Sequence, residues 1–474
     1  MSRPVARLLA ALLLATPLLA ATPNRPPNIL FLLIDDLGWG DFSCFGNTEA
    51  KTPNIDRLAA EGMAFTQFYV NSPICSPSRC ALLTGQYPQR WRITSYLNNR
   101  ADNTRRGMAQ WLDPQAPSLG RTLQAAGYAT GHFGKWHLGG QRDVADAPAI
   151  ARYGFDASLT NFEGMGPKLL PLTRTPDARA YQKIWGDAER LGGPVTWLDR
   201  AQITGGYADA ALRFIDGAAA QGKPFYVNLW PDDVHSPYFP PLEQWTPGKH
   251  RLYLAVLAEM DRQLGRILDR IRNDASLRDN TLVIVCSDNG PEPGAGQAGP
   301  FRGNKTQLFE GGIRSPLIVW APGLMAPARV GGRNDASVLA GIDLAPSLTR
   351  LAGAKKPEGD PLDGEDLSAT LLGHASASRL APLCWSRPPD RKTWPPALPD
   401  PAPDLAIREG DWKLLCEYDG SKPLLYDLKR DPGETRDLAA QEPAVVNRLR
   451  QNLLAWYRAM PADRGPALGA TGGR

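Results

Sequence analysis

Cysteine and histidine are scarce in this sequence, and long apolar runs are nearly absent. Six of the 474 residues are cysteine, too few for a disulfide scaffold in a chain of this length. The formal net charge is only +4 and the charges are dispersed, which argues against a nucleic-acid-binding protein. There is no internal repeat and no heptad pattern. The remaining composition, 43% hydrophobic and 22% charged, is typical of a globular protein.

The one apolar run of note lies at the N-terminus. Arg3 and Arg7 precede a small and apolar stretch over residues 8–19, which is followed by two alanines. This order of charged, apolar and small residues is typical of a secretory signal. A membrane anchor is the alternative, but the run is shorter than the roughly 20 apolar residues that span a bilayer. We therefore predict a signal peptide over residues 1–21, a periplasmic or secreted protein, and no stable membrane span after cleavage.

Three apolar runs end in residue types that carry charge or bind metals. Residues 29–34 run into Asp35 and Asp36, residues 225–230 precede Asp232, Asp233 and His235, and residues 281–286 lead into Asp288 and Asn289. Continuous apolar runs of this length indicate strands buried on both faces, as in parallel sheets. Helical patterns lie between them, at residues 52–62, 118–126 and 252–271.

The alternation of strands and helices predicts an α/β fold with helices on both faces of a large sheet. In such folds, ligands bind beyond the carboxyl ends of the strands, so the three polar clusters mark the expected site.

The composition changes near residue 375, after which the chain is rich in proline up to residue 404. We predict a large domain over residues 22–375, a proline-rich connection over 376–404, a small α+β domain over 405–460 and a flexible tail over 461–474. Within the small domain, residues 405–408, 412–416 and 424–428 have the pattern of short antiparallel strands, and a helix follows over 443–460.

The most specific segment of the chain is Cys75-Ser-Pro-Ser-Arg79, which continues to a Leu-Thr-Gly triplet ending at Gly85. A lone cysteine is more often a buried structural residue. Here the whole segment resembles the signature of type I sulfatases, in which the cysteine is oxidised to formylglycine. Segments 28–41, 52–62, 134–139 and 287–290 are also similar to this family, in the family's order. Within it, the chain resembles the arylsulfatases and N-acetylgalactosamine-6-sulfatases.

The resemblance implies an alkaline-phosphatase-like fold, in which helices sandwich a large mixed sheet and a small C-terminal α+β domain carries an antiparallel sheet. It also implies one calcium ion and the hydrolysis of sulfate esters. The residues agree with a hard cation, because Asp35, Asp36, Asp288 and Asn289 supply oxygen ligands from two strand ends. Cys75, as hydrated formylglycine (3-oxoalanine), would complete the metal shell. Its conversion requires a formylglycine-generating or equivalent maturation enzyme, acting on the unfolded chain around export.

In the implied reaction, one hydroxyl of the formylglycine diol attacks sulfur and the alcohol leaves. The second hydroxyl then collapses to the aldehyde and expels sulfate, which a serine could not do. By the resemblance, Arg79 and Lys135 hold the diol, His137 is the base for the collapse, His235 protonates the leaving oxygen, and Lys305 binds a sulfate oxygen. Cationic groups around the sulfuryl oxygens are the expected source of transition-state stabilisation.

Three alternatives compete with this hypothesis. A two-zinc phosphatase of the same fold needs several histidines, and this chain has only five: His132, His137, His235, His250 and His374. A formylglycine-dependent phosphonate or phosphodiester hydrolase remains open, because such relatives share the Cys-x-Pro-x-Arg pattern. An inactive relative that binds sulfated glycans has little support, because every expected catalytic residue type is present.

Two further segments are expected to line the pocket. Residues 90–106 mix aromatic residues with arginines, including Arg100 and Arg105, and residues 161–167 precede a loop that reaches Trp197. Arginine binds carboxylates and sulfates, and aromatic rings stack on sugars, although ordinary loop and core roles are nearly as compatible with these patterns. The hypothesis is a sulfated small-molecule or glycan substrate, such as a hexosamine 6-sulfate.

Overall fold

The computed structural model describes residues 25–356, 361–390 and 402–462. The expected signal peptide, most of the expected tail and part of the proline-rich connection lie outside these ranges. Within them, no helix is long and apolar enough to cross a membrane.

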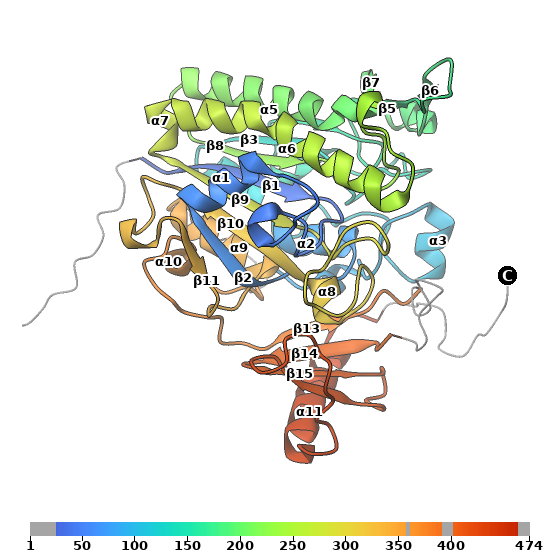
Figure 1. Cartoon of the computed structure of the whole chain (residues 1–474), viewed down its shortest axis with the longest axis vertical. Helices are drawn as coiled ribbons and strands as arrows, with labels where there is room; N and C mark the ends of the chain where they lie inside the picture. Colours follow the sequence, from blue (N-terminus) through green and yellow to red (C-terminus); the bar gives the residue numbers. More distant parts are fainter. Residues whose placement is uncertain (1–24, 357–360, 391–401, 463–474) are drawn as a thin grey trace, which may run out of the picture.

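A large mixed sheet forms the centre of the molecule (Figure 1). Its strand order is β11-β2-β10-β9-β1-β8-β3-β4-β5-β6, with β12 paired to β2 and β7 paired to β5. The strands are β1 (Asn28–Ile34), β2 (Met63–Tyr69), β3 (Ala129–Gly134), β4 (Ala157–Thr160), β5 (Lys168–Thr173), β6 (Gln182–Lys183), β7 (Val195–Asp199), β8 (Phe225–Trp230), β9 (Thr281–Ser287), β10 (Arg314–Trp320), β11 (Gly332–Asn334) and β12 (Leu339–Ala340). The neighbours β9, β1, β8 and β3 are parallel, whereas β10 runs antiparallel to β9 and β2.

Helices cover both faces of this sheet, as the sequence predicts. The helices are α1 (Pro53–Glu61), α2 (Cys75–Thr84), α3 (Arg100–Arg105), α4 (Leu119–Ala125), α5 (Ile203–Ala220), α6 (Lys249–Asn273), α7 (Ala275–Arg278), α8 (Glu310–Ile313), α9 (Gly341–Leu351), α10 (Ser368–Leu371) and, beside the second sheet, α11 (Pro443–Ala459). In Figure 1, α5 and α6 lie above the sheet, and α2 and α9 lie on its other side.

Strand β1 explains why the sequence shows an unbroken apolar run here. Ile29, Phe31 and Leu33 join the core shared with α2, α4 and α9. The alternate residues Leu30, Leu32 and Ile34 join the core shared with α1, α5 and α6. Because both faces of the strand are covered, every side chain from Ile29 to Ile34 is apolar and fully buried.

The second sheet is antiparallel, with strand order β13-β14-β15-β16, and lies with α11 at the bottom of Figure 1. Its strands are β13 (Leu383–Ser386), β14 (Leu405–Glu409), β15 (Trp412–Cys416) and β16 (Leu424–Asp427). The last three coincide with the predicted strands, and α11 with the predicted helix. β13, however, lies in the segment expected to be an irregular connection. It is not predicted because four apolar and polar residues between prolines form too short a pattern to indicate a strand. The apolar core below the large sheet continues into this small sheet through Trp385 and Leu414.

Candidate active site

The acidic residues that follow β1 and β9 meet at the carboxyl edge of the large sheet. The two strands are parallel neighbours in which Ile34 pairs with Ser287, so the residues that follow them lie at the same level. Asp35, Asp36 and Asp288 are fully buried, and one oxygen of each lies within 4.8 Å of the others. Burial, followed by the nearby Asp35 charge, raises the pKa of Asp288 well above its usual range. Three crowded carboxyl groups of this kind favour a bound cation.

Asn289 supplies a fourth oxygen to the cluster. Its amide nitrogen donates to Asp36 Oδ1 at 2.8 Å and to the Gly290 carbonyl at 2.9 Å, so its Oδ1 atom is left for another partner. Asn289 Oδ1 and Asp35 Oδ1 are both buried, and neither accepts a hydrogen bond. Because calcium is bound by carboxylate and amide oxygens, these four residues fit a calcium ion.

Helix α2 brings Cys75 and Arg79 to this cluster. Cys75 is the first residue of the helix, and Arg79 lies one turn later on the same side. Arg79 donates to Asp288 Oδ2 through Nε at 3.0 Å and through Nη2 at 2.8 Å, and Nη1 donates to the Lys135 carbonyl at 2.7 Å. Burial raises the pKa of the Cys75 thiol. The signature segment thus joins the expected nucleophile to the expected metal ligands.

Lys135 follows β3, which lies next to β8 in the sheet. Its backbone N–H donates to the Trp230 carbonyl at 2.7 Å, and its Nζ lies 2.7 Å from Asp35 Oδ2. Burial alone would lower the pKa of Lys135, but the Asp35 carboxylate holds it well above the usual value. Lys135 is therefore a fixed positive charge beside the acidic cluster.

His137 lies two residues further on, in a left-handed conformation with φ of 54°. Its Nε2 lies 2.9 Å from the Leu97 carbonyl and 3.3 Å from Glu163 Oε1. Both neighbours accept hydrogen bonds, so Nε2 carries the proton and Nδ1, which is buried without a partner, is the basic atom of the neutral ring. Burial lowers the pKa of His137 to about 4, against the opposing charge of Glu163.

His235 and Lys305 approach the cluster from its other side. The Nδ1 atom of His235 donates to the Ser236 carbonyl at 2.6 Å, and its Nε2 lies 3.6 Å from Asp36 Oδ2. Desolvation, followed by the charge of Lys305, lowers the pKa of His235. Lys305 Nζ lies 2.6 Å from Asp36 Oδ2, and this carboxylate raises the pKa of the lysine although burial opposes it.

The other two acidic residues after β8 have a different place. Asp232 and Asp233 both pair with the buried Arg200, at 3.3 and 2.8 Å. They are not part of the three-carboxylate cluster.

A cavity of about 370 Å³ opens above the cluster. It is lined by Ile74, Cys75, Tyr96, Lys135, His137, Arg142, Phe162, Glu163, Trp185, His235, Ser236, Glu292, Lys305 and Thr306. Five of the six residues expected to be catalytic line this cavity, and the sixth, Arg79, lies fully buried behind Cys75.

Several residues of the cavity wall are not individual candidates from the sequence, among them Glu163, Phe162, Arg142 and Trp185. Glu163 and Phe162 fall in the segment that was expected to line the pocket, but nothing in the sequence marks their contacts. Arg142 and Trp185 lie in irregular segments, and Trp185 belongs to the loop that follows residues 161–167 and precedes Trp197. Such residues come together only through long-range packing of loops, for which the sequence has no periodic signal.

The two arginines anticipated in the pocket do not line it. The Arg100 side chain pairs with Asp146, and Arg105 pairs with Asp102 at 3.1 Å; Arg105 is exposed and Arg100 is partly exposed. Each faces a nearby carboxylate on the surface, which satisfies its charge away from the cavity.

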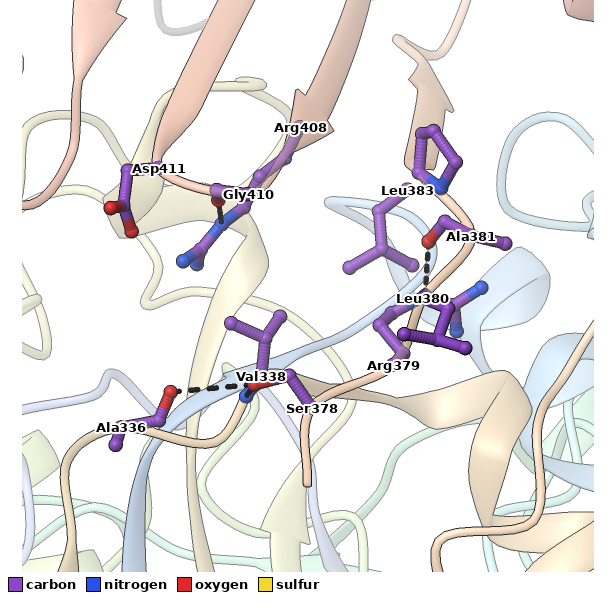
Figure 2. A pocket seen from close by; sticks show the side chains of 11 residues that line it. Ala336, Val338, Ser378, Arg379, Leu380, Ala381, Leu383, Arg408, Gly410 and Asp411 are labelled. Atoms are coloured by element: carbon purple, nitrogen blue, oxygen red, sulfur yellow. Dashed lines mark hydrogen bonds between the residues drawn. The ribbon is translucent and has the colours of Figure 1, made fainter. Parts of the chain in front are cut away.

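A second cavity, of about 130 Å³, lies beside the small sheet (Figure 2). Its two arginines are already bonded: Arg379 pairs with Asp343 at 2.5 Å, and Arg408 donates to Gln67 at 2.6 Å and to the Gly410 carbonyl at 3.0 Å. No cysteine, histidine or serine–histidine pair lines this cavity. Five of the six side chains expected to be catalytic thus line the cavity above the acidic cluster and not this one.

The fold and this site are those of a hydrolase that acts on an anionic ester, with an acidic cluster that could hold a metal ion. A candidate nucleophile, two histidines and three cationic side chains surround a buried set of oxygen ligands, an arrangement suited to stabilising charge on a transferred sulfuryl or phosphoryl group.

Comparison with known proteins resolves the family. Residues 27–354 match the family model described as Sulfatase. The chain is 32% identical to human arylsulfatase A, over 90% of this chain and 87% of that protein. It is 35% identical to rat N-acetylgalactosamine-6-sulfatase, over 78% of this chain and 70% of that protein. A solved structure described for the metabolism of multiple glycosaminoglycans by Bacteroides thetaiotaomicron matches with a TM-score of 0.73 and 26% identity, covering 92% of this chain and all of that one.

The chain belongs to the sulfatase family and is a sulfuric ester hydrolase. The predicted alkaline-phosphatase-like α/β fold with a small antiparallel domain is confirmed.

Proposed function

We propose that this enzyme hydrolyses carbohydrate sulfate esters, with a formylglycine made from Cys75 as nucleophile and one calcium ion at the strand ends. The observation that carries the proposal is the joint position of Cys75 and the four oxygen-bearing residues, which Arg79 ties together through Asp288.

Asp35, Asp36, Asp288 and Asn289 would hold the calcium ion, together with the side chain at position 75. The buried oxygens that accept no hydrogen bond, on Asp35 and Asn289, support this assignment. Calcium, when bound, supplies positive charge next to the reacting groups. Formylglycine, when formed by a maturation enzyme around export, supplies a hydrated aldehyde whose hydroxyl group is the nucleophile.

The remaining residues bind, orient and move protons. Lys135 and Arg79 hold the side chain at position 75 and neutralise charge, and Lys305 binds a sulfuryl oxygen. His137 accepts a proton at Nδ1, because its Nε2 proton faces the Leu97 carbonyl and Glu163. In its doubly protonated form, with Nδ1 donating to the Ser236 carbonyl and the second proton on Nε2 near Asp36, His235 donates the Nε2 proton to the leaving alcohol.

The expected substrate is a sulfated sugar, either free or at the end of a glycan. The name of the rat relative, an N-acetylgalactosamine-6-sulfatase, supports a hexosamine 6-sulfate. The aromatic side chains of Phe162 and Trp185 in the cavity wall suit a sugar ring. The N-terminal signal pattern supports a periplasmic or secreted location.

The proposal is tested by the hydrolysis of matched aryl sulfate and aryl phosphate esters, with Cys75→Ala as the control. The protein is produced in a host that makes formylglycine, and the mass of the Cys75 peptide reports its conversion. We expect turnover of the sulfate that requires both Cys75 and calcium. Dominant turnover of the phosphate would instead assign the chain to the phosphonate or phosphodiester hydrolases, and persistent Cys75 thiol in the active enzyme would exclude the formylglycine nucleophile.

A further inference from the structure

Arg142 differs from the other cationic side chains of the active-site cavity. Lys135 pairs with Asp35, and Lys305 pairs with Asp36. The Arg142 guanidinium, in contrast, has no hydrogen bond or ion pair within residues 25–356, 361–390 and 402–462. It lies over the Phe162 ring, 5.2 Å from the ring centroid. Its positive charge is therefore available to a ligand in the cavity.

The backbone around Arg142 is fixed by hydrogen bonds of the loop to which it belongs. Its backbone has φ of 53°, a left-handed conformation that is uncommon for arginine. The Arg142 carbonyl accepts two hydrogen bonds from Arg190, through Nη2 at 2.8 Å and through Nε at 3.3 Å. The preceding residue, Gln141, is buried and donates to the Asn98 carbonyl at 3.0 Å. The backbone of Arg142 is thus held in place while its side chain reaches the cavity.

The aromatic support under Arg142 is also ordered. Phe162 stacks on Trp185 with a centroid distance of 3.9 Å and an interplanar angle of 21°. All three side chains line the same cavity as Cys75. A guanidinium held over the face of an aromatic ring keeps the N–H groups at its own edge free. These groups can bind a carboxylate or a sulfate with two hydrogen bonds.

The carboxylates of the cavity do not neutralise this charge. Glu163 faces Lys135 and His137, at 3.4 and 3.3 Å. Glu292 accepts from Tyr238 at 2.9 Å and pairs with Lys249 at 2.7 Å.

We propose that Arg142 binds a second anionic group of the substrate, so that the preferred substrate is a sulfated saccharide that carries a carboxylate or another sulfate besides the ester that is cleaved. The inference rests on the proposed sulfatase function and deepens it by naming a substrate class. The scissile sulfate lies near Cys75, and the second anion lies at the part of the wall formed by Arg142 and its aromatic support.

The test measures binding separately from turnover. In a Cys75→Ala background, calorimetry gives the Kd of three sulfated disaccharides: one with a single sulfate, one that also has a uronic carboxylate, and one with two sulfates. We expect the carboxylated or the disulfated sugar to bind about 10- to 100-fold more tightly than the monosulfated one, and Arg142→Gln to abolish this preference. Arg142→Lys should retain part of it, because it keeps the charge but not the fork. Arg100→Gln, which removes an arginine outside the cavity, is the matched control and should retain all of it.

Turnover of an aryl sulfate whose aryl group is uncharged, measured with the formylglycine enzyme, completes the test. Arg142→Gln should lower its kcat/KM far less than the kcat/KM for the sugar with two anionic groups, because this substrate has no second anion. If the aryl sulfate is hydrolysed but no dianionic sugar is preferred, or the preference survives Arg142→Gln, the Arg142 proposal is wrong and the sulfatase proposal stands. If the preference depends on Arg142 but no sulfate ester is hydrolysed, the binding site stands and the proposed reaction is wrong.

Discussion

Two buried charge clusters in this protein look alike in composition but differ in how their charges are satisfied. At the strand ends, Lys305 lies 2.6 Å from Asp36 and faces a cavity. Between the two sheets, Lys413 lies 2.9 Å from Glu310 and 2.8 Å from Glu434, and all three side chains are fully buried. Both lysines are thus enclosed by carboxylates that come from distant parts of the chain.

The second cluster is closed by partners from within the protein. Glu310 also accepts from Tyr69 at 2.6 Å and pairs with Arg314 at 3.1 Å. Although burial alone would raise it, the Lys413 charge lowers the pKa of Glu310 to about 2. Glu434 Oε1 also accepts no hydrogen bond, but it lies 2.8 Å from Lys413 Nζ within the cluster. At the strand ends, in contrast, the oxygens without a hydrogen bond belong to Asp35, one of three clustered carboxylates that could hold a metal ion, and to Asn289 next to Asp288. Burial of charge alone therefore does not identify a site; unsatisfied ligand atoms next to a cavity do.

The largest effect on stability is expected from Lys413→Met. The substitution leaves Glu310 and Glu434 buried without their shared cation, which should lower the free energy of unfolding by about 3–5 kcal/mol. Denaturant unfolding measures the loss, and kcat/KM per folded molecule should stay unchanged. Adding Glu434→Gln to Lys413→Met removes one of the unpaired buried carboxylates and should recover part of the stability. If the loss in the double variant equals the sum of the losses in the two single variants, the two residues do not interact.

Lys305→Met is the change in the active site that matches Lys413→Met in the buried cluster. We expect it to lower activity more than stability. Without a cation for the sulfuryl oxygens, kcat/KM for an aryl sulfate should fall by roughly 10²- to 10³-fold. In calcium-containing buffer, the free energy of unfolding should change less than in Lys413→Met. The comparison between the clusters would break down if Lys305→Met kept its activity and lost as much stability as Lys413→Met.

Glu163→Gln should give a smaller effect with a distinctive pH dependence. Glu163 acts through Lys135 and His137 and so is a positioning residue, for which a 10- to 100-fold loss of kcat is typical, about the size seen for supporting residues of metal sites. Its negative charge opposes the effect of burial on the pKa of His137, so its removal should lower that pKa. The acid limb of the pH–rate profile, where His137 becomes protonated, should then move to lower pH.

Glu292→Gln is the control for this prediction, since Glu292 lines the same cavity but is held by Tyr238 and Lys249. A shift of equal size in both variants would mean that the general charge of the cavity, and not the contact with His137, sets the profile.

The difference between the clusters also separates what the sequence predicts from what it does not. Asp35 and Asp288 could be placed together because each follows an apolar run long enough to be a buried parallel strand, and such strands end at one edge. Cys75 and Arg79 could be added because their spacing is one helical turn and their segment resembles a family signature. These are local patterns, so they can be recognised in the sequence without knowing how the loops fold.

Glu163, Arg142 and the Glu310–Lys413–Glu434 cluster carry no such pattern. Lys413 and Glu310 are 103 positions apart, and each has the sequence environment of an ordinary surface charge. β13 was missed for a related reason: its burial depends on pairing with β14, which lies beyond a proline-rich segment. Contacts between distant segments depend on how the segments pack in the folded chain, and a single sequence does not predict this packing.

We expect calcium to bind at the strand ends, where oxygens of Asp35 and Asn289 accept no hydrogen bond, and not at the Glu310–Lys413–Glu434 cluster. This expectation is tested most directly by calcium titration of the full chain, followed by calorimetry, for the wild type, Asp36→Asn and Glu434→Gln. The account predicts one calcium ion per chain in the wild type and in Glu434→Gln, and strongly weakened binding in Asp36→Asn. Wild-type protein that binds no calcium, or binding that Asp36→Asn leaves unchanged, would contradict it.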